Sequence, residues 1–118
     1  MASHNDLGRY GEEIGKSFLE QKNFEILHIN WKYSYYEIDI IASKNNVLHF
    51  IEVKTRRSEQ FGLPEESVDK KKLKKMMNAA EEFLFRFPVW KRVQYDVLSI
   101  SFVDSNEPEF FLIEDVYL

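Results

Sequence analysis

The sequence YEIDIIASKNNVLHFIEVKT, residues 36–55, contains two runs of mainly β-branched and aromatic residues on either side of a polar triplet. Such runs favour β-strands, and we expect one strand over residues 36–43 and another over residues 47–55. The triplet Lys44-Asn45-Asn46 has the composition of a tight turn. This stretch therefore predicts a hairpin around which the remaining elements are arranged.

Three charged residues interrupt these apolar strands: Asp39 in the first strand, and Glu52 and Lys54 in the second. An unpaired carboxylate in such surroundings would lose much of its hydration free energy, so each charge needs compensation. Because side chains alternate along a strand, Glu52 and Lys54 point to one face, and Asp39 joins them if the strands pair. Two carboxylates beside a lysine make an oxygen-rich site for a divalent metal. The alternative is a solvated edge-strand pair that prevents aggregation.

The rest of the chain supplies two helices and three further strands. Apolar residues at helical spacing indicate a first helix, with Asp6 able to cap it and Gly8, Gly11 and Gly15 suited to close approach to the sheet. We expect a strand over 24–31 before the hairpin. A loop over 58–66 then leads to a helix over 68–87 that Pro88 stops, and strands over 93–102 and 109–116 are joined by a turn at 104–108. The order αβββαββ predicts an α/β fold with a mixed central sheet flanked by helices.

Several short motifs occur in a fixed order along the chain. They are Gly11-Glu12, Glu37-Ile38-Asp39, Glu52-Val53-Lys54-Thr55-Arg56, Val68-Asp69 with Lys71, and Tyr95-Asp96-Val97. In this order, from about residue 8 to residue 97, the chain resembles the YraN-type family of uncharacterised bacterial proteins. The resemblance implies a restriction-endonuclease-like fold of the PD-(D/E)xK nuclease superfamily, similar in layout to archaeal Holliday-junction resolvases. The chain departs from the family pattern at Tyr36, where glycine is usual, and at Gly15, where alanine is usual.

By this resemblance Glu12, Asp39, Glu52 and Lys54 match the catalytic positions of the superfamily. Asp39 and Glu52 are the expected metal ligands, helped by the backbone carbonyl of Val53, with Glu12 acting directly or through a water. Lys54 is expected to orient the attacking water and to stabilise developing negative charge. The role of Glu37 stays open.

Composition limits the class of protein. The chain has 118 residues, of which 44% are hydrophobic, and this is enough for a single domain over 1–118 with one core. A polar N-terminus and the absence of a long apolar run predict a cytoplasmic protein without a membrane segment. There is no cysteine, and the three histidines are scattered, so any metal is expected to be held by oxygen, as Mg²⁺ or Mn²⁺ would be.

The net charge of −4 argues mildly against the binding of nucleic acid, but the distribution of charge along the chain weakens that objection. From Lys54 to Lys75 there are eight basic residues against four acids, a local balance of +4. Five lysines lie near the start of the second predicted helix, where cations oppose the helix dipole, so phosphate contact explains their placement better than stability does. The candidates for nucleic-acid binding are Arg56, Arg57, Lys70, Lys71 and Lys74. A solvated helix face is the alternative for any single lysine.

Other residues have structural interpretations that compete with functional ones. The aromatic segment 31–36 could stack unpaired bases, but half-buried hairpin aromatics explain it equally well. His28 and His49 lie inside predicted strands and are expected to be hydrogen-bonded core residues.

Together, the motifs predict a magnesium-dependent endonuclease that hydrolyses DNA, with branched or structured DNA as the expected substrate. The alternative is a nucleic-acid-binding module that keeps the nuclease fold, cleaves nothing itself and acts beside a DNA-processing partner. A third interpretation is a protein-interaction scaffold that uses the acidic, aromatic segment 109–118. A homodimer is left open.

Overall fold

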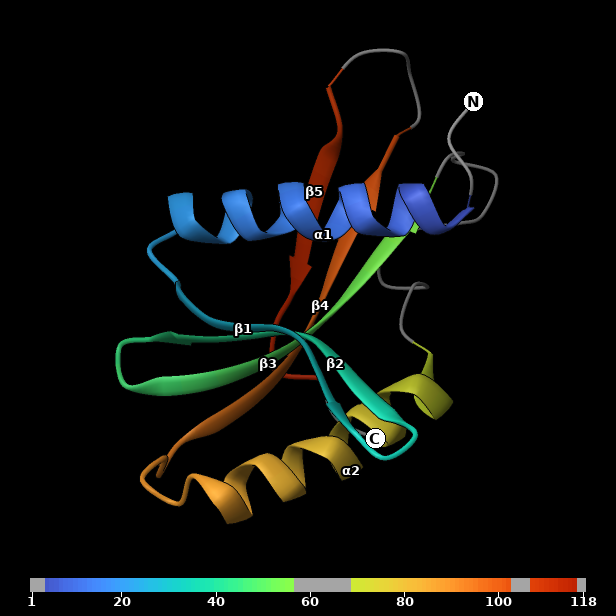
Figure 1. Cartoon of the computed structure of the whole chain (residues 1–118). Helices are drawn as coiled ribbons and strands as arrows, with labels where there is room; N and C mark the ends of the chain where they lie inside the picture. The colour runs from blue at the N-terminus through green and yellow to red at the C-terminus, as the bar shows by residue number, and fades with distance from the viewer. Residues whose placement is uncertain (1–3, 57–68, 103–106, 117–118) are drawn as a thin grey trace.

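A computed structural model of the chain describes residues 4–56, 69–102 and 107–116 (Figure 1). The predicted order αβββαββ is confirmed. The elements are α1 His4–Gln21, β1 Glu25–Tyr33, β2 Tyr36–Lys44, β3 Val47–Arg56, α2 Lys70–Arg86, β4 Val93–Ser101 and β5 Glu109–Ile113. No helix in these ranges is long and apolar enough to cross a membrane.

The five strands form one mixed sheet in the order β1-β2-β3-β4-β5. Neighbouring strands are antiparallel except for β3 and β4, which are parallel and are connected through α2. The two helices lie on opposite sides of the sheet (Figure 1). The prediction of an α/β fold with a mixed sheet flanked by helices is therefore confirmed, and this arrangement is compatible with a restriction-endonuclease-like fold.

Each face of the sheet has its own apolar core, because β2 and β3 are buried on both sides. Toward α2, Ile38 and Phe50 pack with helix residues such as Leu73 and Phe83. Toward α1, a second cluster is formed by Leu19, Phe24, Ile40, Ala42, Ile51, Leu98 and Ile100. The sheet is thus covered on both faces, as expected when a parallel pair of strands is present.

The hairpin between β2 and β3 has a tighter turn than predicted. Lys44 pairs with Val47, so the connection consists of Asn45 and Asn46 alone. Both residues have positive φ, 53° and 66°, as a type I′ turn requires. Asparagine tolerates this left-handed conformation, which explains why two asparagines stand here.

Several element ends differ from the predicted ones. Helix α1 begins at His4, so Asp6 stands inside the helix and not at the predicted N-cap position. Helix α2 begins at Lys70 because Asp69 is its N-cap, and the Asp69 carboxylate accepts hydrogen bonds from the backbone N–H groups of Lys71 and Lys72. Strand β5 ends at Ile113. The predicted loop 58–66 and most of the turn at 104–108 lie outside the described residues.

Helix α1 lies very close to the sheet at Gly11. A Cβ atom built on Gly11 would lie 2.3 Å from Cγ2 of Thr55, and one on Gly15 would lie 3.1 Å from a methyl of Leu98. Around Gly8, by contrast, there is nothing within 4 Å. Close approach therefore explains two of the three glycines, and it holds the neighbouring Glu12 against the end of β3.

A buried polar cluster lies where β3 and β4 begin. Asp96 is fully buried and accepts hydrogen bonds from Nδ1 of His49 at 2.6 Å, Nε2 of Gln94 at 2.9 Å and the backbone N–H of Asp115 at 2.9 Å. The prediction that His49 is a hydrogen-bonded core residue is confirmed. The same prediction was wrong for His28, which is exposed and packs its ring edge-on to Phe83.

Candidate functional site

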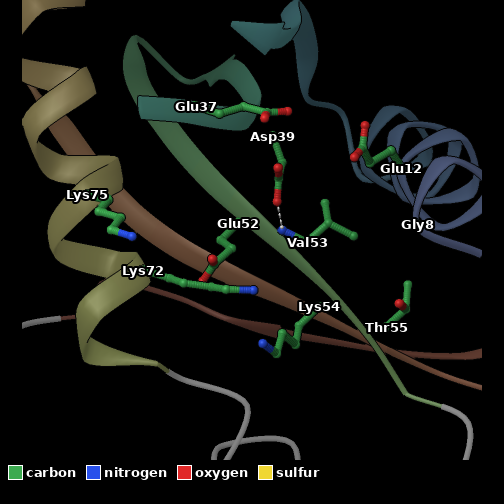
Figure 2. A pocket seen from close by; sticks show the side chains of 10 residues that line it. All are labelled: Gly8, Glu12, Glu37, Asp39, Glu52, Val53, Lys54, Thr55, Lys72 and Lys75. Atoms are coloured by element: carbon green, nitrogen blue, oxygen red, sulfur yellow. Dashed lines mark hydrogen bonds between the residues drawn. The ribbon is translucent and has the colours of Figure 1, made fainter. Parts of the chain in front are cut away.

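A cavity of about 410 Å³ opens beside the C-terminal half of β3 (Figure 2). Its walls come from α1, β2, β3 and α2. All four predicted catalytic residues line it, together with Val53 and five further residues. The complete lining is Gly8, Glu12, Glu37, Asp39, Glu52, Val53, Lys54, Thr55, Lys72 and Lys75.

The cavity lies where the ladder between β2 and β3 ends. Pairing runs from Lys44–Val47 to Ile40–Ile51 and does not continue beyond that pair. At the next position the acceptor is a side chain and not a backbone carbonyl. Oδ2 of Asp39 accepts a hydrogen bond of 2.8 Å from the backbone N–H of Val53. The two strands therefore separate at a carboxylate, and a space opens between them.

Strand β2 is irregular at the same position. Ile38 and Ile41 pack in the same core cluster, although strict alternation would put residues three apart on opposite faces. This irregularity turns Asp39 into the opening between the strands. Strand β3 stays regular, so Glu52 and Lys54 share one face as predicted, and this is the face toward α2.

The acids of the cavity are held in surroundings that disfavour their charge. Burial raises the pKa of Asp39 from 3.8 to about 7, opposed by the hydrogen bond from Val53 and assisted by repulsion from Glu12, Glu52 and Glu37. Burial also raises the pKa of Glu12, which a hydrogen bond from the Asn30 side chain partly offsets. A group of acids arranged in this way would be stabilised by a bound cation.

Glu52 has an oxygen that the surrounding protein leaves unsatisfied. Burial raises the pKa of Glu52, and the charges of Lys72 and then Lys54 oppose that rise. Its Oε2 atom is buried and has no hydrogen-bond partner among the residues that the structure describes. Buried carboxylate oxygens are normally hydrogen-bonded or bound to a metal, so this atom is a candidate ligand.

Lysines approach the acids from two elements. Burial lowers the pKa of Lys54, and the neighbouring Lys72 lowers it further through its charge and a side-chain hydrogen bond. Figure 2 shows Lys72 reaching from α2 to the side chain of Glu52, with Lys75 one turn further along the helix. The cavity is thus lined by four acids and three lysines.

The carboxylates suit a hard divalent cation that keeps part of its water shell. Within residues 4–56, 69–102 and 107–116, no three His, Cys, Asp or Glu side chains form a group that could by itself hold a metal ion. Mg²⁺ does not need such a group, since it is commonly bound by one or two carboxylates, water and substrate phosphates. Asp39 and Glu52, with the unsatisfied Oε2 of Glu52, fit that requirement.

The residues predicted to contact nucleic acid differ in exposure, and none of those that the structure describes lines the cavity. Lys70, Lys71 and Lys74 are exposed on α2 but do not line the cavity, whereas Lys72 and Lys75 do. Arg56 is buried at the end of β3, and Arg57 lies outside the described residues. The roles assigned to all of these residues stay predictions.

Sequence reasoning did not single out three features of the site. Lys72 lines the cavity, but it is exposed like the other lysines of α2, and its spacing from the buried residues of the helix does not distinguish it from them. Glu37 lines the cavity and raises the pKa of both Asp39 and Glu12. The side chain of Asn30 hydrogen-bonds to Glu12, and the backbone of Asn30 is in the left-handed conformation, with φ of 53°. No local sequence pattern indicates this contact.

Fold and cavity define the class as a small α/β domain, compatible with a restriction-endonuclease-like fold, with a cavity lined by acids and lysines where two central strands separate. The chain belongs to the uncharacterised protein family UPF0102, whose sequence model matches residues 11–100. The resemblance to the YraN-type family is thereby confirmed.

Relatives match along nearly the whole chain. A UPF0102 protein of Flavobacterium psychrophilum is 39% identical over 117 residues, covering 99% of this chain and 98% of its own. A UPF0102 protein of Clostridium perfringens is 39% identical over 120 residues, with the same coverage. One from Bacteroides thetaiotaomicron is 39% identical over 106 residues, covering 90% of this chain and 88% of its own.

Proposed function

We propose that this protein is a metal-dependent nuclease that hydrolyses phosphodiester bonds in DNA, with branched or structured DNA as its substrate. One observation carries the proposal: Glu12, Asp39, Glu52 and Lys54, which come from three different elements, line one cavity. Collecting like charges at partly buried positions is unfavourable for stability, and such arrangements are concentrated at functional sites.

Asp39 and Glu52 would hold Mg²⁺ or Mn²⁺, helped by the carbonyl of Val53, with Glu12 binding directly or through a water. When bound, the ion supplies neutralisation of the scissile phosphate and of the acids themselves. Asp39 is already oriented for this role, because Val53 fixes one of its two oxygens and leaves the other available.

Lys54 would act on the attacking water. It lies two residues after Glu52 on the same face of β3 and lines the same cavity. Since burial and the charge of Lys72 lower the pKa of Lys54, its Nζ atom is closer to the unprotonated form at neutral pH than an ordinary lysine. An unprotonated Nζ can accept a proton from water, and the protonated form can then stabilise negative charge.

Cleavage assays test the proposal directly. Purified protein is incubated with linear, flapped and four-way-junction DNA in Mg²⁺, in Mn²⁺ and in EDTA. We expect metal-dependent cleavage that Asp39→Asn and Glu52→Gln each reduce by about 100-fold or more, since they remove charge at the ligand positions. Glu109→Gln, at an exposed acid on β5, is the matched control and is expected to cut normally. Asp39→Asn and Glu52→Gln variants that cut as fast as this control would show that the cavity is not the site.

A catalytically silent nucleic-acid-binding module is the second candidate. It is favoured by one observation, the exposed lysines of α2 that lie outside the cavity, Lys70, Lys71 and Lys74, which could contact phosphates without any chemistry. Under this alternative the protein binds DNA with an affinity that falls steeply with salt but cleaves none of the substrates in any metal. The same assays, combined with binding measured at several salt concentrations, distinguish the two candidates.

A further inference from the structure

Lys72 lines the cavity from the first turn of α2 and, like the neighbouring lysines, is an exposed residue. Leu73 beside it is buried in the core, while the preceding Lys70 and Lys71 are exposed and outside the cavity. Asp69 fixes the backbone at this point, because its carboxylate accepts from the N–H of Lys72. The Asp69 cap therefore fixes the backbone from which the Lys72 side chain reaches the cavity.

The Lys72 side chain brings a second amine to the partly buried acids. Lys72 and Lys54 come from different elements and line the same cavity as Glu52 (Figure 2). The charge of Lys72, ahead of that of Lys54, opposes the rise in the pKa of Glu52, and Lys72 also lowers the pKa of Lys54. Glu52 alone cannot balance two positive charges, and Asp69, which acts weakly on both amines, is at the outer edge of the group.

This placement is unfavourable for the isolated fold in two respects. Two like charges that line one cavity repel, and a cation in the first turn of a helix opposes the helix dipole. The first turn of α2 itself contains no acid, and the acid that offsets the dipole is the N-cap Asp69. An additional anion in the cavity would relieve both effects, and a phosphate has the required charge and acceptor oxygens.

We propose that Lys72 is a further catalytic residue, whose ammonium group contacts a non-bridging oxygen of the scissile phosphate. The inference rests on the proposed nuclease function. In the hydrolysis, the water oxygen forms the new bond to phosphorus, and the proton that this water loses passes to solvent. The bond to the leaving oxygen breaks with its electron pair, and that oxygen takes a proton from solvent. Lys72 transfers no proton; it neutralises charge on the phosphate throughout.

The two lysines would then have separate tasks. Lys54 lies on β3 next to Glu52 and acts on the water, while Lys72 reaches in from α2 and acts on the phosphate. In the substrate-free protein the charge of Lys72 opposes the rise in the pKa of Glu52. Electrostatic groups positioned at a reacting centre typically contribute about 100- to 1000-fold to the rate.

The test compares Lys72→Met with Lys72→Arg and with Lys91→Met. Lys91 is exposed and precedes Val93, which pairs with Leu48 at the opposite end of β3 from the cavity. We expect the single-turnover cleavage rate of Lys72→Met to fall about 100-fold, and Lys72→Arg to recover at least a tenth of the wild-type rate, because arginine keeps the charge. The melting temperature should stay within a few degrees of wild type in all three variants.

A binding measurement keeps the test independent of cleavage. The probe is the dinucleotide pTpT, titrated in Ca²⁺ and followed by NMR. We expect Lys72→Met to bind it about 10-fold more weakly than wild type, and Lys91→Met to bind it equally well. If the wild-type protein cuts no DNA, the nuclease proposal fails and this measurement alone decides the role of Lys72. A Lys72→Met variant that binds pTpT as tightly as Lys91→Met overturns the inference in either case.

Discussion

Replacing Asp39 with asparagine should make the metal-free protein more stable, and increasingly so as the pH rises. The pKa of Asp39 is raised by burial from 3.8 to about 7 in the folded protein. Between these two values the folded state holds a proton that the unfolded state has lost. The free energy of unfolding of the wild type therefore falls as the pH increases from about 4 to about 7.

The structure sets the size of this effect. At about 1.36 kcal/mol per pH unit, the full shift of Asp39 corresponds to an upper limit of about 4 kcal/mol above pH 7. About half of this difference should develop between pH 5 and pH 8. Asparagine carries no charge but keeps an oxygen that can accept the hydrogen bond from Val53, so the variant avoids the loss without breaking the contact. We expect Asp39→Asn to exceed wild type by between about 1 and about 4 kcal/mol at pH 8.

Urea denaturation in EDTA at pH 5, 6, 7 and 8, followed by circular dichroism, measures the difference. Glu25→Gln, at an exposed acid at the start of β1, is the matched control and should follow wild type at every pH. Saturating Mn²⁺ should stabilise wild type, by about 2.7 kcal/mol at 100 times its Kd, and leave Asp39→Asn nearly unchanged. A variant no more stable than wild type at pH 8, or a gap that narrows with rising pH, would refute the reasoning.

Three further predictions concern other parts of the molecule. Gly11→Ala should destabilise the protein by about 1–3 kcal/mol in urea denaturation, because the new methyl clashes with Thr55, whereas Gly8→Ala should be neutral or stabilising by up to about 1 kcal/mol. Asp96→Ala should cost about 3–5 kcal/mol in the same assay, since it leaves His49 buried without its partner; a loss below about 1 kcal/mol would contradict this. The three lysines of α2 that lie outside the cavity are tested together by DNA binding at several salt concentrations. Their replacement by glutamine should make the slope of log affinity against log salt shallower by up to about 3, and an unchanged slope would assign them to a solvated face. The substitutions in that variant are Lys70→Gln, Lys71→Gln and Lys74→Gln.

The order of elements could be predicted from the sequence because local patterns determine it. Apolar runs of strand length, the paired asparagines at 45 and 46 and the stop at Pro88 each act over a few residues. The alternation of side chains along β3 also places Glu52 and Lys54 on one face without any knowledge of the fold. In each of these cases, residues close in sequence determine the local structure.

The details of the site depend on contacts between distant segments, and local patterns do not reveal them. The end of the β2–β3 ladder at Ile40–Ile51 is set by the irregularity in β2 and by the Asp39 hydrogen bond to Val53. The selection of Lys72 from five lysines depends on where α2 meets the sheet. Asn30 reaches Glu12 only because α1 packs against the start of the sheet.

The hydrogen bond between Asp39 and Val53 links the fold to the proposed chemistry. Where β2 leaves β3, the N–H of Val53 loses its place in the ladder, and a buried N–H without an acceptor is unfavourable. The Asp39 carboxylate satisfies this N–H with one oxygen and is thereby oriented with the other oxygen available at the cavity. The same contact ends the ladder and positions a candidate metal ligand, so Asp39→Ala would disturb strand pairing and charge together. Asp39→Asn separates strand pairing from charge, because asparagine preserves the hydrogen-bond acceptor and removes only the negative charge. A loss of cleavage in Asp39→Asn without a loss of stability would therefore be attributable to metal binding.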